Sequence, residues 1–111
     1  MKIERYSIYW ANLDPVVGAE INKTRPVAVV SDDLMNLHLQ TVVVCPLTTA
    51  IHSSWRSRIQ ISVKSKESEI AVDQIRTISK KRLIKKIGAL SADEAARVRL
   101  LITEMYGEKS P

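Results

Sequence analysis

The stretch GAEINKTRPVAVVSDD, residues 18–33, changes character near its middle. Its first half is polar and begins with a glycine, whereas residues 27–30 are a run of valine and alanine that ends at a Ser-Asp-Asp cluster. Apolar runs of this length bounded by turn-forming residues are typical of buried strands. We therefore predict a loop over residues 14–24 and a strand over residues 25–31, with Arg25 at the junction between them.

Similar runs on either side of this strand predict a sheet. Residues 41–48 are apolar at three consecutive positions, so this strand is expected to be central, and Pro46 near its end predicts a bulge or the loss of one ladder hydrogen bond. Strict alternation of apolar and polar residues predicts a half-exposed strand over residues 59–63. Further strands are expected over residues 7–13, 69–78 and 85–90.

The last part of the chain has the pattern of a helix. Ser91 and Glu94 have the spacing of a capping box, and apolar residues from Ala95 to Met105 recur at steps of three and four. Gly107 lies where such a helix would stop. Short strands followed by one helix predict an α+β, mostly β fold, with a small and strongly bent antiparallel sheet or barrel of the SH3-like kind.

A shorter helical turn is expected between the second and third strands, ending near Leu37, because Ser31 or Asp32 is placed to cap it.

The bulk properties limit the class of protein. A chain of 111 residues is expected to form one domain, residues 1–111. The first residues do not form a secretory signal, and the longest apolar runs are too short to span a bilayer, so no membrane partner is expected. A single cysteine, Cys45, cannot form an internal disulfide. These features favour a cytoplasmic protein.

The net charge of +5 is carried by the second half of the chain. The segment RTISKKRLIKK, residues 76–86, has many cations and no acid, and its spaced isoleucines suggest strand edges or a hairpin. Such a density of cations attracts the phosphates of a nucleic acid, although a solvated face that keeps the protein soluble has the same composition.

Several enzyme signatures are absent from the sequence. It has no phosphate-binding glycine loop, no zinc pattern of paired cysteines or HExxH, and no GxSxG motif, so we expect neither a metal nor another cofactor. Two histidines could cleave RNA by an acid–base relay. His38 is expected at the surface or the edge of the core, whereas His52 follows the strand 41–48 and could stand near a site.

Four ordered segments carry a family resemblance. WANLDPVVGAE, KTRPVAVVS, VVVCPLTTAI and AVDQIRTISKKRL together resemble the MazF/PemK family of toxin endoribonucleases, the toxin halves of bacterial toxin–antitoxin pairs. The resemblance runs from Tyr9 to the terminal helix. It implies a CcdB/PemK-type fold, a homodimer, and sequence-specific, metal-independent cleavage of single-stranded RNA such as mRNA. It also implies a cognate antitoxin that blocks the RNA groove.

The resemblance implies that Arg25 and Thr48 are the catalytic pair, that Glu20 contacts RNA, and that Gln74 lies by the groove and the dimer contact. Metal-free RNA cleavage uses the ribose 2′-hydroxyl as nucleophile, and an arginine fork with a threonine hydroxyl suits the charge that develops on the phosphate. Arginine is a poor proton acceptor, so the general base is left open. The predicted RNA-binding residues are Glu20, Lys23, Thr49, Asp73, Gln74 and Arg76.

The chain departs from the family at two places. In the PemK branch an aspartate acts as base with an arginine and a histidine as helpers; here Asp73 is kept, but Ala71 and Ala19 occupy the helper positions, which favours the arginine–threonine mechanism. In addition, Tyr6 stands where family members often have glycine, which predicts altered local packing.

Purely structural roles are open for these residues. Arg25 could pair with an acid at the mouth of its strand, Thr48 could cap a turn, and Glu20 could be loop surface. Trp10 is expected in the core or a dimer contact, whereas Trp55, in a loop with two arginines nearby, is the better candidate for base stacking.

Two other functions are also open. CcdB-type toxins share this fold and bind gyrase, but they end in a Trp-Gly-Ile element, whereas this chain ends in MYGEKSP. The third possibility is an RNA-binding relative without catalysis.

Overall fold

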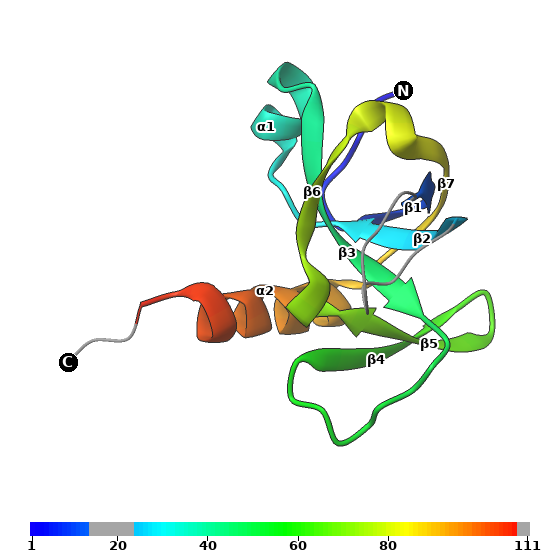
Figure 1. Ribbon diagram of the computed structural model, residues 1–111, viewed down its shortest axis with the longest axis vertical. Coiled ribbons are helices and arrows are strands. Elements are labelled where there is room, and N and C mark those ends of the chain that lie inside the picture. Colours follow the sequence, from blue (N-terminus) through cyan, green and yellow to red (C-terminus); the bar gives the residue numbers. More distant parts are fainter. Residues whose placement is uncertain (14–23, 109–111) are drawn as a thin grey trace.

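The computed structural model describes residues 1–13 and 24–108, and these form a curled antiparallel sheet with two helices, the longer of which is C-terminal and packs against the sheet (Figure 1). The predicted loop over residues 14–24 therefore lies outside the described residues up to residue 23. The elements are β1 (Ser7–Asn12), β2 (Thr24–Val29), α1 (Asp33–His38), β3 (Thr41–Thr48), β4 (Arg58–Val63), β5 (Lys66–Ala71), the short 3-10 turn η1 (Val72–Gln74), β6 (Arg76–Ser79), the 3-10 turn η2 (Lys80–Arg82), β7 (Leu83–Ala89) and α2 (Ala92–Tyr106).

The strands follow the order β4-β5-β3-β2-β1-β7, with β6 paired to β3 off this path. Every pairing is antiparallel. β3 is central as predicted, because β2 lies along one of its edges and β5 and β6 share the other. The mostly β fold with a bent antiparallel sheet and a C-terminal helix is confirmed.

The prediction of one strand over residues 69–78 was wrong, because this part of the chain runs along β3 in two pieces. Leu47 pairs with Ile70 in β5, and Val44 pairs with Arg76 in β6. Between these two pairs, the segment that runs along β3 has more residues than β3 itself, and the extra residues form the η1 turn. The edge strand therefore leaves the ladder opposite Cys45 and Pro46.

Proline chemistry explains why the gap lies there. Val43 exchanges hydrogen bonds with Val30 and Ser31 on the β2 side of β3. Since backbone groups alternate between the two edges of a strand, Pro46 faces the edge shared by β5 and β6. Proline has no N–H to donate there, so one rung of the ladder is missing where the neighbouring strand turns away.

The basic segment 76–86 is also divided. It comprises β6, the η2 turn and β7, but β6 pairs with β3 whereas β7 pairs with β1. The strand edges expected from its isoleucines are confirmed, and the hairpin expected as the alternative is not present between these two strands.

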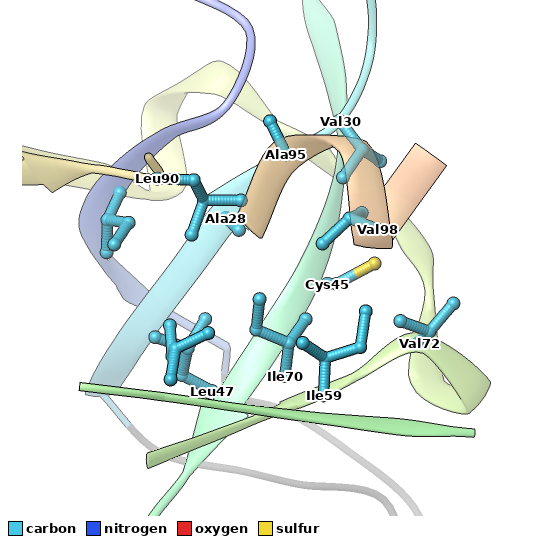
Figure 2. Packing of buried hydrophobic residues seen from close by; sticks show 12 residues of the cluster. Ala28, Val30, Cys45, Leu47, Ile59, Ile70, Val72, Leu90, Ala95 and Val98 are labelled. Carbon is cyan, nitrogen blue, oxygen red and sulfur yellow. The ribbon is translucent and has the colours of Figure 1, made fainter. Parts of the chain in front are cut away.

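Apolar side chains cover both faces of the central strands. Ala28 and Cys45 belong to a cluster beneath α2, which contributes Ala95 and Val98 (Figure 2). The alternate residues of β2 and β3 enter a second cluster on the other face, within the curl of the sheet. Burial on both faces accounts for the uninterrupted apolar runs from which these strands were predicted.

Both helices begin at the predicted caps. The Asp32 carboxylate accepts the Met35 N–H at 2.9 Å, and Ser91 and Glu94 form a reciprocal capping box at 3.1 and 2.8 Å. α2 ends at Gly107, where a β-carbon would lie 2.5 Å from the Thr103 carbonyl oxygen. Within the part of the chain that the structure describes, no helix is long and apolar enough to cross a membrane.

Tyr6 has a left-handed backbone, with φ of 66°. The backbone there is held by two hydrogen bonds, from its own N–H to the Val29 carbonyl and from the Leu90 N–H to its carbonyl. This conformation is favourable for glycine and costs a residue with a side chain about 1–2 kcal/mol. The tyrosine thus changes the local energetics as well as the packing.

Candidate nucleic-acid interface

Arg25 and Thr48 line one groove, of about 400 Å³. Val27 pairs with Pro46, so continuing the antiparallel register by two residues places Arg25 opposite Thr48. The start of β2 and the end of β3 therefore meet at the same end of the sheet. Two residues that are far apart in the chain are brought side by side by one strand pairing.

Backbone contacts hold both side chains. The half-buried Arg25 guanidinium donates from Nη1 to the Leu47 carbonyl oxygen at 3.5 Å. Thr48 is 9% exposed, and its Oγ1 accepts the Ala50 N–H at 3.1 Å. Because the hydroxyl oxygen acts as acceptor in this bond, its proton can be donated to a molecule in the groove.

The groove has cations that the sequence did not single out. Lys64 and Lys66, at the hairpin that joins β4 and β5, line it together with Arg25. Of the residues that the structure describes, none of those lining the groove is acidic. Both lysines fell between the strands predicted over residues 59–63 and 69–78, and it is the observed pairing of Val63 with Lys66 that places them at a hairpin tip.

Trp10 also lines the groove and is half-buried, so it is not enclosed in the core, whereas the dimer contact stays a prediction. Trp10 pairs across β1 and β2 with Pro26, which is also in the lining. A side chain on one face of a curled sheet can thus form the wall of a groove without entering the core.

The predicted RNA-binding residues fall into three groups. Glu20 and Lys23 lie outside the described residues. Thr49 lines the groove beside Thr48 and is exposed. The other three, Asp73, Gln74 and Arg76, line a separate hollow of about 230 Å³.

A buried ionic network, which sequence reasoning missed, lies beside the groove. Glu69 pairs with Thr48 across β3 and β5, is 0% exposed, and accepts from Arg58 Nη1 at 2.9 Å. Its carboxylate also accepts the His52 N–H at 2.8 Å and the Gln60 amide at 2.7 Å. Three donors, two from β4 and one from the loop before it, thus satisfy one buried charge.

Arg58 joins this carboxylate to a second one. Its Nε donates to Asp73 at 2.8 Å and its Nη2 at 3.4 Å. Burial would raise the pKa of Asp73, but hydrogen bonds from Arg58 and Ser57 outweigh it and hold the pKa below its usual range. A carboxylate with a lowered pKa is a weak proton acceptor, which together with its place outside the groove argues against Asp73 as the base.

The same balance applies to Glu69 itself. Burial would raise the pKa of Glu69, but the hydrogen bonds from His52, Gln60 and Arg58 hold it below its ordinary value. Neither carboxylate is therefore neutral near pH 7.

Trp55 is occupied by protein contacts. The His52 ring stacks on it at 3.9 Å between centroids and 10° between planes, and the Arg58 guanidinium lies 4.6 Å from its ring centre. Trp55 keeps 46% exposure, but two groups already lie against its ring. His52 belongs to this cluster and not to the groove lining, and His38 is exposed at the end of α1.

The basic η2 turn lies far from the groove. The Lys80 N–H donates to the Gln40 carbonyl at 3.0 Å, which places the turn at the start of β3. Thr48 is the last residue of β3, and a strand rises about 3.3 Å per residue, so the two sites are roughly 23 Å apart. Figure 1 shows the yellow η2 segment and the β4–β5 hairpin at opposite ends of the molecule.

Within residues 1–13 and 24–108, no group of three or more His, Cys, Asp and Glu side chains is placed to hold a metal ion.

Known proteins resemble both the sequence and the fold. Residues 4–106 match a family model described as PemK-like, MazF-like toxin of type II toxin–antitoxin system. Endoribonuclease EndoA of Bacillus subtilis is 34% identical over 115 residues, which cover 94% of this chain and 99% of the relative. MazF from Deinococcus radiodurans (Form-I) has a TM-score of 0.83 at 21% identity, covering 97% of this chain and 99% of that one. An endoribonuclease from mycobacterial species, solved in complex with its cognate antitoxin, has a TM-score of 0.80 at 19% identity, covering 98% and 99%. The fold is MazF-like, and the chain belongs to the family of PemK-like, MazF-like toxins of type II toxin–antitoxin systems.

Proposed function

We propose that this chain is a metal-independent endoribonuclease toxin that cleaves single-stranded RNA such as mRNA at particular sequences. The observation that carries the proposal is the placement of Arg25 and Thr48 side by side in one open groove with two further cations. The family match and the endoribonuclease names of the relatives agree with it. Phosphate contacts are the dominant source of affinity for nucleic acids, which suits a cationic groove.

The proposed reaction is a transesterification followed by release. The ribose 2′-oxygen attacks the phosphorus, the bond from phosphorus to the 5′-oxygen breaks, and the products are a 2′,3′-cyclic phosphate and a 5′-hydroxyl. Solvent in the open groove accepts the 2′-hydroxyl proton. The Arg25 guanidinium donates a proton to the leaving 5′-oxygen and takes one back from solvent, so the enzyme is restored. Arg25 and the Thr48 hydroxyl donate to the phosphoryl oxygens as negative charge grows on them, which lowers the barrier.

We also propose that two copies form a homodimer and that a cognate antitoxin blocks the groove. The mycobacterial endoribonuclease in complex with its antitoxin supports the second part. Asp73, Gln74 and Arg76 remain proposed RNA contacts, and because their hollow is separate from the groove, RNA that reaches both must extend beyond Thr48.

The decisive test measures cleavage of single-stranded RNA in EDTA by the wild-type chain and two variants. Arg25→Ala and Thr48→Val should each lower kcat/KM by at least ~100-fold, because each removes a donor to the transition state. Matched controls are Arg99→Ala on α2 and Thr41→Val at the far end of β3, both exposed and outside the groove lining, and these should retain activity. The released fragments should carry 5′-hydroxyl ends.

Full activity in both groove variants would refute the assigned residues. RNA binding by the wild type without any cleavage would refute the enzymatic proposal and leave an RNA-binding relative.

A further inference from the structure

We infer that the groove holds three successive parts of an RNA strand in a fixed order: a base on Trp10, the scissile phosphate at Arg25 and Thr48, and a neighbouring phosphate at Lys66 and Lys64. The inference rests on the proposed function, because it assigns the scissile position to the arginine–threonine pair. Nothing in the family resemblance assigned a role to either lysine or placed Trp10 at the RNA.

The order follows from the sheet. Trp10 on β1 pairs with Pro26, the neighbour of Arg25 on β2. On the other side, Thr48 at the end of β3 pairs with Glu69 of β5, and β5 leads back to its hairpin with β4. Trp10 and the hairpin tip therefore lie on opposite sides of the arginine–threonine pair. Neighbouring strands lie about 4.8 Å apart and a strand rises about 3.3 Å per residue, so Trp10 is about one strand spacing from Arg25, whereas Lys66 is about 10 Å along β5 from Glu69, the residue opposite Thr48.

The Trp10 end of the groove is apolar. The half-buried indole is accompanied in the lining by Pro26 and Ile87. An indole fixed in a sheet with part of its surface open is a platform on which any base can stack, and apolar neighbours keep water from the stack. The apolar lining at this end therefore suits a base.

The hairpin end has the opposite chemistry. Lys64 and Lys66 are exposed side chains that line the groove, and they flank the turn that connects β4 to β5. A lysine ammonium is a compact charge on a flexible stem, which binds phosphate oxygens without reading sequence. This end therefore suits the backbone of the strand and leaves base selection to other contacts.

The η2 turn offers an internal comparison. Lys80 and Lys81 form an equally basic pair, but they lie at the other end of β3 from Thr48. If charge alone decided binding, the two lysine pairs would contribute equally to the affinity for nucleic acid. If the bound RNA strand follows the groove, only the hairpin pair contributes.

The experiment measures binding of a fluorescent single-stranded DNA oligonucleotide as a function of salt, since DNA has no 2′-hydroxyl and is not cleaved. The Lys64→Ala/Lys66→Ala double variant should reduce the slope of log K against log salt by about 1.4, or ~0.7 for each lost phosphate contact. The Lys80→Ala/Lys81→Ala variant should keep the wild-type slope. An unchanged slope in the hairpin variant, or an equal decrease in the η2 variant, would overturn the inference.

The Trp10 end is tested in the same assay. Trp10→Leu should weaken DNA binding by about fivefold to 150-fold, the range expected for loss of one base stack, whereas Trp10→Phe keeps an aromatic face and should stay close to wild type. Equal weakening in both variants would show that the indole acts through packing, and would remove the base position from the groove. A wild-type chain that binds DNA in the expected pattern but cuts no RNA would refute the proposed activity and leave the order of the groove intact.

Discussion

Glu69 is unusual because its charged side chain is fully buried. A fully buried carboxylate is costly unless each of its lone pairs has a donor, and Glu69 has donors from Arg58, Gln60 and the His52 backbone. It also pairs with Thr48 across two strands. The network thus ties the segment that follows Thr48 to β4 and β5, directly behind the groove.

The ion pair of Arg58 and Glu69 gives a prediction for stability. Arg58→Met leaves a buried carboxylate without its cation and should lower the free energy of unfolding by about 3–5 kcal/mol, as measured by urea denaturation. In Arg58→Met/Glu69→Gln the amide oxygen still accepts the His52 N–H, so part of this loss should be recovered. The matched control is Arg56→Met: its bridge to Glu104, at 3.2 Å, is exposed, and its loss should change stability by less than about 1 kcal/mol.

A similar effect of Arg58→Met and Arg56→Met would mean that the buried pair contributes no more than a surface pair. A double variant less stable than Arg58→Met would mean that the charge on Glu69 is itself stabilising without its partner.

The family resemblance pointed to the arginine and threonine of the groove, but nothing in the sequence pointed to this network. Arg25 and Thr48 lie in KTRPVAVVS and VVVCPLTTAI, two of the segments that carry the resemblance. Arg58 and Glu69 are ordinary charged residues on strands, and no local spacing marks them as partners, since they meet through the register of β4 and β5. A sequence pattern does not show which residues of two strands the register of their pairing brings into contact.

At the scale of elements, the β4–β5 hairpin combines a strained turn with two groove lysines. Val63 pairs with Lys66, so Lys64 and Ser65 form a two-residue connection, with φ of 49° and 66°. Positive φ at both positions is the geometry of a type I′ turn, which favours asparagine and glycine. A side chain in this conformation costs about 1 kcal/mol.

Ser65→Gly should therefore stabilise the protein by roughly 0.5–1 kcal/mol, because glycine adopts positive φ without the steric cost. Ser62→Gly is the matched control: Ser62 is exposed within β4, one residue before its end, where glycine should destabilise by a similar amount. Thermal denaturation of the two variants distinguishes the cases by the sign of the change. A destabilising effect of Ser65→Gly would mean that the serine makes up for the strain of its own backbone.

Some elements could be predicted from the residues that form them, and others could not. The bounds of β3 agree with the prediction, because its apolar run is bounded by polar residues on both sides. The α2 cap was predictable from two side chains three positions apart. The break between β5 and β6 was not, because its cause is Pro46 on a neighbouring strand and not a residue of the segment that breaks.

At the scale of the whole molecule, two groups of cations among the residues that the structure describes differ in their consequences. The groove has Arg25, Lys64 and Lys66, whereas the more basic η2 turn lies at the far end of β3. The sequence composition pointed to the η2 turn, because its cations are consecutive in the chain. The fold brings the groove cations together from two separate segments, the start of β2 and the β4–β5 hairpin, which explains why net charge predicted a nucleic-acid partner but not its position.

Stability of the whole molecule should depend on pH through the same buried network. The folded-state pKa values of Glu69 and Asp73 lie below their ordinary values, and in the unfolded chain these groups titrate near about 4.3 and 3.9. Above roughly pH 6 both groups are charged in both states, so their contribution to stability is fully present. As the pH falls below about 4, the unfolded chain takes up protons first and the contribution is lost.

Urea unfolding of the wild type between pH 7 and pH 3 should therefore show a fall in the free energy of unfolding in the acid range. Arg58→Met/Glu69→Gln should show a shallower fall, since it lacks one carboxylate and the cation that lowers the pKa of the other, whereas Arg56→Met should follow the wild type. Equal slopes in all three proteins would place the acid sensitivity in carboxylates outside the network.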